Sequence, residues 1–184
     1  AASDVYKRQG MKVAIVGPTG AGKTTMVNLL MRFYEVNGGD ITIDGVSVKD
    51  MPREEIHDIF GMVLQDTWMF EGTLRENILF SKTGVSDEEL ENICREAGIS
   101  HFVHTLPNGL DTYMDGEASV SGGQKQRLCI ARAVAMGAEI LIFDDSFSAL
   151  DYKTDRKVRE NLANEAKGTT KLLSLIHISE PTRR

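Results

Sequence analysis

One stretch of the sequence constrains the fold more than any other: a short apolar run, a glycine-rich segment and an amphipathic run follow one another without a gap. The apolar run, Met11–Val16, has the length of a buried strand, and the glycine-rich segment is Gly17–Thr24. Apolar residues then recur at the i, i+3, i+4 and i+7 positions across Val27–Tyr34, which predicts an α-helix. A strand, a tight turn and a helix in succession are typical of α/β proteins with a parallel sheet.

The rest of the chain extends this pattern. Two more apolar runs, Ile59–Gln65 and Glu139–Asp145, predict buried strands, and residues 73–135 read as mostly helical. Asp40–Val48 alternates apolar and polar residues around Asp44-Gly45, which predicts an antiparallel hairpin, and a charged helix is expected over 152–166. The expected fold class is therefore α/β, with a mainly parallel central sheet flanked by helices, a partial antiparallel β part and a helical part.

The glycine-rich segment reads GPTGAGKT and matches the phosphate-binding pattern G-x-x-x-x-G-K-[ST] in its required strand–loop–helix setting. Glycines let successive backbone N–H groups face the phosphates, and the helix N-terminus adds positive potential. Lys23 is expected to reach the β- and γ-phosphates, and the Thr24 hydroxyl to bind Mg²⁺. The residues assigned to nucleotide binding here are Gly17, Pro18, Thr19, Gly20, Ala21, Gly22, Lys23, Thr24 and Thr25.

A carboxylate supplies the expected second metal ligand. Asp144 ends the apolar run Ile140–Phe143, and ligands of open parallel sheets lie at the carboxyl ends of the strands. We therefore expect Asp144 to hold Mg²⁺ against the phosphates.

A second glycine motif narrows the choice among nucleotide-binding families. Ser121–Gln124 reads S-G-G-Q ahead of a basic, Ala-rich helix, with Ser121 and Gln124 spaced as a capping box. Two glycines in a first helical turn are costly unless a group such as a phosphate approaches closely. Together with the phosphate loop, this motif resembles the signature of ATP-binding cassette (ABC) ATPases, whose usual form begins with Leu where this chain has Val120. The resemblance implies a P-loop NTPase fold that binds ATP and Mg²⁺.

The resemblance also implies roles for other residues. Gln65 lies in a segment that resembles the Q-loop, and Ser148–Asp151 resembles the D-loop, which crosses to a second subunit. By resemblance the catalytic residues are Asp145, Gln65 and Lys23, and the Mg²⁺ ligands are Thr24, Gln65 and Asp144. In such a dimer the phosphate loop of one cassette faces the signature of the other, so that the γ-phosphate held by the partner would meet Ser121, Gly122, Gly123 and Gln124.

The segment after the Q-loop points to a class of transporter. Residues Gln65–Ile78 look most like exporter-type cassettes, in which this region faces the membrane domain. Trp68-Met69-Phe70 is interpreted either as such a contact or as core. The implied partners are a second ABC ATPase subunit and an exporter's transmembrane domain, which lies outside these 184 residues and places the cassette at the cytoplasmic face of the membrane.

The sequence departs from the family at Asp145, where a hydrolysing cassette usually carries Glu. Aspartate is one methylene shorter, and a displacement of roughly 1 Å can cost on the order of 10²-fold in rate. The substitution resembles the weakened subunit of asymmetric exporters, which keeps an intact signature for its partner. A heterodimer is therefore the favoured hypothesis, and a homodimer with slow hydrolysis is the rival.

Two further family features have no counterpart in this sequence. The switch histidine is expected near Ile176, and His177 lies one position away inside a terminal segment that looks foreign. Tyr6 lies too close to Gly17 to be the aromatic residue that stacks on adenine. We therefore expect this chain to bind ATP weakly and to aggregate through an open sheet edge.

Composition excludes several functions. A formal net charge of −6 and a pI near 5.3 argue against a nucleic-acid partner bound through a basic face. Cys94 and Cys129 are expected to be reduced packing thiols. No apolar run approaches the ~18 residues of a membrane span. The alternatives to an exporter are a soluble ABC-type ATPase and a nucleotide-gated interaction module that does not hydrolyse ATP.

Both ends of the chain differ in character from the middle. Residues 1–9 and 174–184 resemble translated sequencing adapter and are expected to be foreign to the domain. The ABC ATPase domain is accordingly expected over residues 10–173, from Gly10 to Leu173, truncated at both ends.

Overall fold

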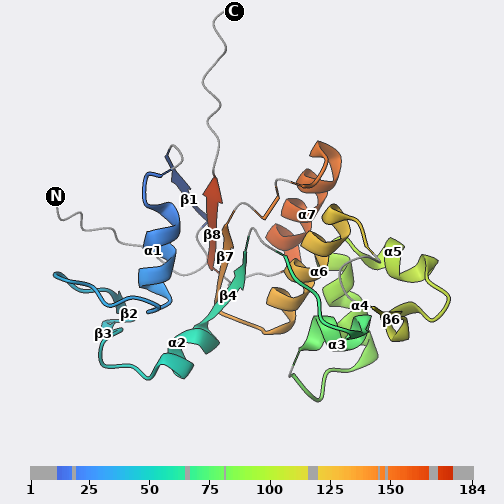
Figure 1. Cartoon of the computed structure of the whole chain (residues 1–184), viewed down its shortest axis with the longest axis horizontal. Helices are drawn as coiled ribbons and strands as arrows, with labels where there is room; N and C mark the ends of the chain where they lie inside the picture. Colours follow the sequence, from blue (N-terminus) through green and yellow to red (C-terminus); the bar gives the residue numbers. More distant parts are fainter. Residues whose placement is uncertain are drawn as a thin grey trace, which may run out of the picture. The chain divides into compact units, whose positions relative to one another are not determined.

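The computed structural model describes residues 12–17, 20–64, 67–80, 82–115, 120–144, 146–147, 149–165 and 170–175; it leaves the side chains of 12, 163–165 and 170–175 undescribed. Contacts divide these residues into two compact units. Unit 1 comprises the described residues up to 62 together with 138–144 and 170–175, and unit 2 comprises those within 63–137 and 146–165. Figure 1 labels most elements of both units, and the α/β class expected from the sequence is confirmed.

Unit 1 is built on a four-stranded sheet in the order β1-β8-β7-β4. Its strands are β1 (Lys12–Val16), β4 (Phe60–Val63), β7 (Ile140–Asp144) and β8 (Thr170–Leu175). Strand β8 runs parallel to both β1 and β7, and Ser174 pairs with Ile15 on one side and with Asp144 on the other. The carboxyl ends of β1 and β7 therefore lie at the same level of the sheet, one strand apart. This register brings the start of the glycine-rich segment and Asp144 to a common edge.

Two helices and a hairpin complete unit 1, and Figure 1 shows α1 running beside the sheet. They are α1 (Lys23–Leu30), α2 (Arg53–Ile59) and the antiparallel pair β2 (Thr42–Ile43) with β3 (Val46–Ser47). The hairpin turns at Asp44-Gly45 as predicted, and both turn residues have positive φ. Buried side chains from α1, α2, β4, β7 and the connecting segments form one core: Val27, Met31, Val48, Met51, Ile56, Phe60 and Ile142.

The first helix is shorter than its apolar spacing predicts. Helix α1 ends at Leu30, whereas the pattern extends to Tyr34. Arg32 adopts a left-handed φ of 52°, which breaks the helix, and its guanidinium donates a 2.6 Å hydrogen bond to the carbonyl of Met51. Tyr34 is consequently 61% exposed. The prediction is wrong at this end because a tertiary hydrogen bond competes with the helical pattern.

Unit 2 is mostly helical, as predicted for residues 73–135. It contains α3 (Leu74–Leu79), α4 (Asp87–Glu96), α5 (Ser100–Thr105), the 3-10 turn η1 (Gly109–Asp111), α6 (Gly122–Ala135) and α7 (Tyr152–Glu165). Helix α6 packs on α3 and α4, and α4 also contacts α7. A two-stranded pair, β5 (Gly72–Thr73) with β6 (Tyr113–Met114), was not predicted, because two-residue strands carry no periodic signal.

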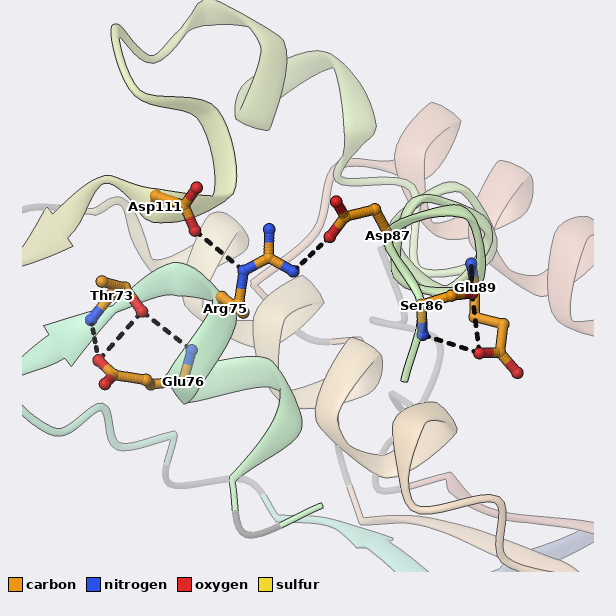
Figure 2. Close-up of polar contacts among 7 residues, drawn as sticks. All are labelled: Thr73, Arg75, Glu76, Ser86, Asp87, Glu89 and Asp111. Atoms are coloured by element: carbon orange, nitrogen blue, oxygen red, sulfur yellow. Dashed lines mark hydrogen bonds and ion pairs between the residues drawn. The ribbon is translucent and has the colours of Figure 1, made fainter. Parts of the chain in front are cut away.

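Helices α3, α4 and α6 of unit 2 start with side-chain caps, two of which are drawn in Figure 2. Ser86 and Glu89 form the predicted capping box of α4, and Thr73 with Glu76 forms a second box at α3. Between the two boxes, Arg75 donates to Asp87 at 2.6 Å and to Asp111 at 2.9 Å. One guanidinium thus joins α3 to the start of α4 and to η1.

Two expectations from composition also concern the described residues. Cys94 and Cys129 are free thiols, and burial raises the pKa of both; that of Cys94 reaches about 12. Within the described ranges, none of the helices has the length and apolar character required to cross a membrane.

Candidate functional site: a phosphate loop and a signature helix

The glycine-rich segment between β1 and α1 forms a loop that only glycine fits at several positions. Gly20 and Gly22 adopt φ of 82° and 84°, in the left-handed region that strains other residues. At Gly17 a Cβ atom would lie 3.1 Å from the Cβ of Ala21, so the loop closes tightly on itself. Gly20, Ala21, Gly22, Thr24 and Thr25 are all exposed. The described part of the loop therefore presents its backbone at the surface, as phosphate binding requires.

Helix α1 begins without a side-chain cap. Its N-cap residue is Gly22, and its first turn has no acidic residue, whereas α3, α4 and α6 all start with capping boxes. A helix N-terminus with backbone donors and no acidic residue in its own first turn is suited to bind an anion. Lys23 follows directly, and its Nζ donates a 2.6 Å hydrogen bond to the carbonyl of Gly17, across the loop. The ammonium group is thus held at the mouth of the loop, where a phosphate can replace the carbonyl.

The two predicted metal ligands that are described lie together. The Thr24 hydroxyl donates a 3.1 Å hydrogen bond to Oδ2 of Asp144, although 120 residues separate them in the chain. Asp144 is 5% exposed, whereas Thr24 is exposed. A hydroxyl and a carboxylate oxygen beside a phosphate loop form the kind of oxygen donor set that Mg²⁺ prefers. These residues therefore fit the ion that the loop motif implies.

The segments that carry Gln65 and Asp145 are tied together by a buried hydrogen bond. Ser146, which follows Asp145, is 0% exposed, and its hydroxyl donates to the carbonyl of Val63 at 2.6 Å. Val63 is the last residue of β4, two positions before Gln65. Gln65 and Asp145 themselves, like Pro18 and Thr19, lie outside the described residues, so their predicted roles stay predictions.

The second glycine motif begins helix α6 as predicted. The Ser121 hydroxyl accepts from the Gln124 backbone N–H at 3.3 Å, and the Ser121 N–H donates to Oε1 of Gln124 at 2.8 Å. This reciprocal pair is a capping box. Ser121 and Gly122 are exposed at the helix start, while Gly123 and Gln124 are partly buried.

A side chain at Gly123 would crowd the neighbouring chain segment. A Cβ atom there would lie 3.3 Å from the carbonyl oxygen of Ala149 and 3.5 Å from a methyl of Leu150. At Gly122 it would lie 3.9 Å from the Cβ of Ala149. Ala149 and Leu150, in the segment that resembles the D-loop, therefore lie against the start of α6, and the approach of a phosphate to the same glycines stays a prediction.

Three aromatic side chains form a cluster on unit 2, which we call the aromatic cluster: Trp68, Phe70 and Phe80. Their ring centroids lie 6.1–6.2 Å apart. Trp68 is 47% exposed and Phe80 57%, whereas Met69 is buried. Met69 therefore belongs to the core, which was one interpretation of Trp68-Met69-Phe70. Trp68 is exposed, as the other interpretation, a contact with a membrane domain, requires.

Sequence reasoning did not identify the residues that support this cluster. Asn77 is 1% exposed and hydrogen-bonds both the N–H and the carbonyl of Phe70. The Arg132 guanidinium lies 4.9 Å from the Trp68 ring centroid, and its Nε donates to the Asn77 carbonyl at 2.8 Å. The only sign of this role in the sequence was Asn77 itself, a polar residue at a helix position where a buried face usually carries an apolar one.

A glycine-rich phosphate loop between a parallel strand and a helix, with a strand-end carboxylate beside its threonine, defines a P-loop NTPase. The capped S-G-G-Q helix distinguishes this domain from other members of that class. The comparisons with known proteins agree: residues 3–148 match the model of the ABC transporter family. The chain belongs to the ABC transporter family, and its fold is that of the family's ATPase domain.

The individual relatives are ABC transporter proteins, and one solved relative is an ABC exporter. The chain is 48% identical over 166 residues to an uncharacterized ABC transporter ATP-binding protein, YwjA, of Bacillus subtilis, covering 89% of this chain and 29% of the relative. It is 47% identical over 147 residues to a fatty acid ABC transporter ATP-binding/permease protein of Mycobacterium bovis, covering 79% and 23%. A solved structure of a bacterial Atm1-family ABC exporter with ATP bound superposes with a TM-score of 0.84 and 37% identity, covering 90% of this chain and 29% of that one. The chain thus spans less than a third of the length of each.

Proposed function

We propose that this chain is the ATP-binding and ATP-hydrolysing motor domain of an ABC exporter. The observation that carries the proposal is the 3.1 Å contact between Thr24 and Asp144. It unites the phosphate loop with the strand-end carboxylate in the arrangement that ATP with Mg²⁺ requires. Family membership and the likeness to an exporter with ATP bound support the same conclusion.

Each predicted site residue has a role in this proposal. The loop backbone from Gly17 to Gly22 and the N-terminus of α1 would bind the phosphates, and Lys23 would neutralise the charge of the β- and γ-phosphates. Thr24 and Asp144 would hold Mg²⁺, which would neutralise charge that develops on the transferred phosphoryl group. Gln65 and Asp145 would orient the attacking water. Ser121–Gln124 would contact the γ-phosphate held by a second cassette.

A transmembrane domain is the proposed partner of the aromatic cluster. Trp68 and Phe80 are half exposed, whereas large aromatic side chains usually contribute to cores or interfaces. The Mycobacterium relative is described as an ATP-binding/permease protein, which supports a membrane partner. The cassette would then work at the cytoplasmic face of the membrane, where closing on ATP and reopening after hydrolysis would drive alternating access.

We further propose that this chain is the weakened half of a heterodimer. Asp145 replaces the usual glutamate, and a shorter carboxylate places a general base farther from water. The signature helix is intact, with its capping box formed. A weakened subunit needs that intact signature, because the competent site of the pair combines the partner's phosphate loop with this chain's Ser121–Gln124.

The experiment is to purify the complete transporter with its partner subunit and to compare ATP turnover of three variants. Asp145→Glu should raise turnover. Ser121→Arg should abolish most of it, because it blocks the competent site, whereas Lys23→Ala should reduce it much less, because it damages only the weakened site. Equal losses for Ser121→Arg and Lys23→Ala would indicate a homodimer. An unchanged rate for Asp145→Glu would refute the weakened-site proposal.

A nucleotide-gated module is the second candidate, and Asp145 is the feature that favours it. If the complete complex binds ATP and closes but does not turn it over, and Asp145→Glu does not restore turnover, this second candidate replaces the motor domain.

A further inference from the structure

A buried glutamine on the signature helix has no role in the site described so far. Gln126 is 4% exposed, and its Oε1 accepts a 3.2 Å hydrogen bond from the backbone N–H of Ala149. Ala149 belongs to the D-loop, so the bond links two motifs that are 23 residues apart. Buried side-chain amides are usually bonded, and a bond to a loop backbone restricts where that loop can lie.

Gln126 and the two signature glycines form one face of α6. Gly122 and Gly123 precede Gln126 by four and three residues, the spacing that places side chains on the same side of a helix. All three meet the same short segment: a Cβ atom at Gly123 would lie 3.3 Å from the Ala149 carbonyl oxygen, while Gln126 binds the Ala149 N–H. The Ala149 carbonyl therefore packs closely against Gly123, and the Ala149 N–H is hydrogen-bonded to Gln126.

The far end of the D-loop is also held. The Asp151 carboxylate accepts from the N–H groups of Lys153 and Thr154 at 3.1 and 3.0 Å. Hydrogen bonding to the Thr154 side chain, together with these N–H groups, lowers the pKa of Asp151. Asp151 thereby starts helix α7. The D-loop is thus bound to α6 by the Gln126 side chain and to α7 by the Asp151 side chain. Both residues lie within unit 2.

We propose that Gln126 is a positioning residue that joins the signature to the D-loop, so that both motifs reach the nucleotide of a partner cassette as one body. This proposal rests on the proposed function, in which Ser121–Gln124 meets the partner's γ-phosphate. Without the Gln126 bond the signature keeps its capping box, but Ala149 loses its fixed place beside it. Closure on ATP then brings only one of the two motifs into position.

The test uses the complete transporter with its partner subunit and the variants Gln126→Met and Gln126→Glu. Methionine keeps the length and burial of the side chain and removes the acceptor, whereas glutamate keeps an acceptor oxygen. We expect Gln126→Met to lower kcat for ATP about tenfold, the size of effect expected when one buried hydrogen bond is broken. KM for ATP should change less than about twofold, because the phosphate loop binds ATP before closure. Gln126→Glu should recover most of kcat.

The matched control is Ser86→Ala, which removes the cap of α4 elsewhere in unit 2 and is expected to lower Tm without changing kcat. Hydrogen exchange of the Ala149 amide supplies a readout that general destabilisation does not reproduce, and it should accelerate in Gln126→Met but not in Ser86→Ala.

Three results would count against the proposal or its basis. A wild-type kcat in Gln126→Met overturns the positioning role and leaves the proposed function intact. An equal loss of kcat in Ser86→Ala at equal Tm assigns Gln126 a purely structural role and also overturns it. A wild-type complex without ATP turnover refutes the proposed function instead, and exchange at Ala149 then still decides whether Gln126 holds the D-loop.

Discussion

Asn77 offers the sharpest test of how unit 2 is held together. This side chain is 1% exposed. Its amide donates to the carbonyls of Phe70 and Thr73 at 3.0 and 3.1 Å and accepts from the Phe70 N–H at 3.2 Å. The Arg132 guanidinium also donates to Oδ1 of Asn77 at 3.4 Å. The perturbation is Asn77→Leu, which keeps the branched shape of the side chain and removes all four bonds.

The structure allows the expected loss of stability to be worked out. Three backbone groups lose a partner, at the low end of about 1–3 kcal/mol each, or roughly 3–5 kcal/mol together. Burying the leucine side chain offsets about 1.5 kcal/mol. The net destabilisation should be about 2–3 kcal/mol, which lowers Tm by about 5–10 °C for a chain of this length.

Trp68 is the only tryptophan of the chain and belongs to the aromatic cluster that Asn77 supports, so its fluorescence reports unfolding in urea and by heat. The matched control is Asn92→Leu on α4, where the amide is partly exposed and accepts a hydrogen bond from Arg95. That change should stay within about 0.5 kcal/mol of wild type. A loss below about 1 kcal/mol in Asn77→Leu, or a loss equal to that of the control, would refute the assignment.

Two further predictions concern caps and turns. Hydrogen bonds from the Thr73 and Ser86 N–H groups hold the pKa of Glu76 and Glu89 below the usual value. The stabilisation from both capping boxes is therefore complete above about pH 4.3 and is lost as pH falls through the lowered pKa values. The urea midpoints of unfolding at pH 7 and pH 3 should differ less in Glu89→Gln than in wild type. Gly98 has φ of 69°, and a Cβ there would lie 3.0 Å from a methyl of Val158, whereas Gly84 has φ of 77° and open space. Gly84→Ala should therefore cost about 1 kcal/mol and Gly98→Ala at least about 1 kcal/mol more; equal costs by urea unfolding would contradict the close approach of Gly98 to α7.

Local features of this protein were readable from its sequence because their causes lie within a few residues. The capping boxes at Ser86 and Ser121 join positions three apart, and the structure contains both. The hairpin at Asp44-Gly45 and the strands that lead to Gly17 and Asp144 follow from residue type and period alone. The rule that ligands of parallel sheets lie at the carboxyl ends of the strands also predicted that Asp144 lies beside the phosphate loop, and Thr24 and Asp144 are hydrogen-bonded.

Tertiary structure decided what depends on contacts between distant segments. Arg32 ends α1 early because the Met51 carbonyl lies within reach, which no helical pattern contains. Gln126 faces Ala149, and Ser146 faces Val63, only after their helices and strands have packed. Hydrogen-bond partners 23 and 83 residues apart leave no periodic trace in the sequence, since the free energy that selects them comes from burial and polar satisfaction in the folded chain. The sequence by itself therefore determined which motifs this domain carries, and the folded structure determined which side chains hold those motifs in place.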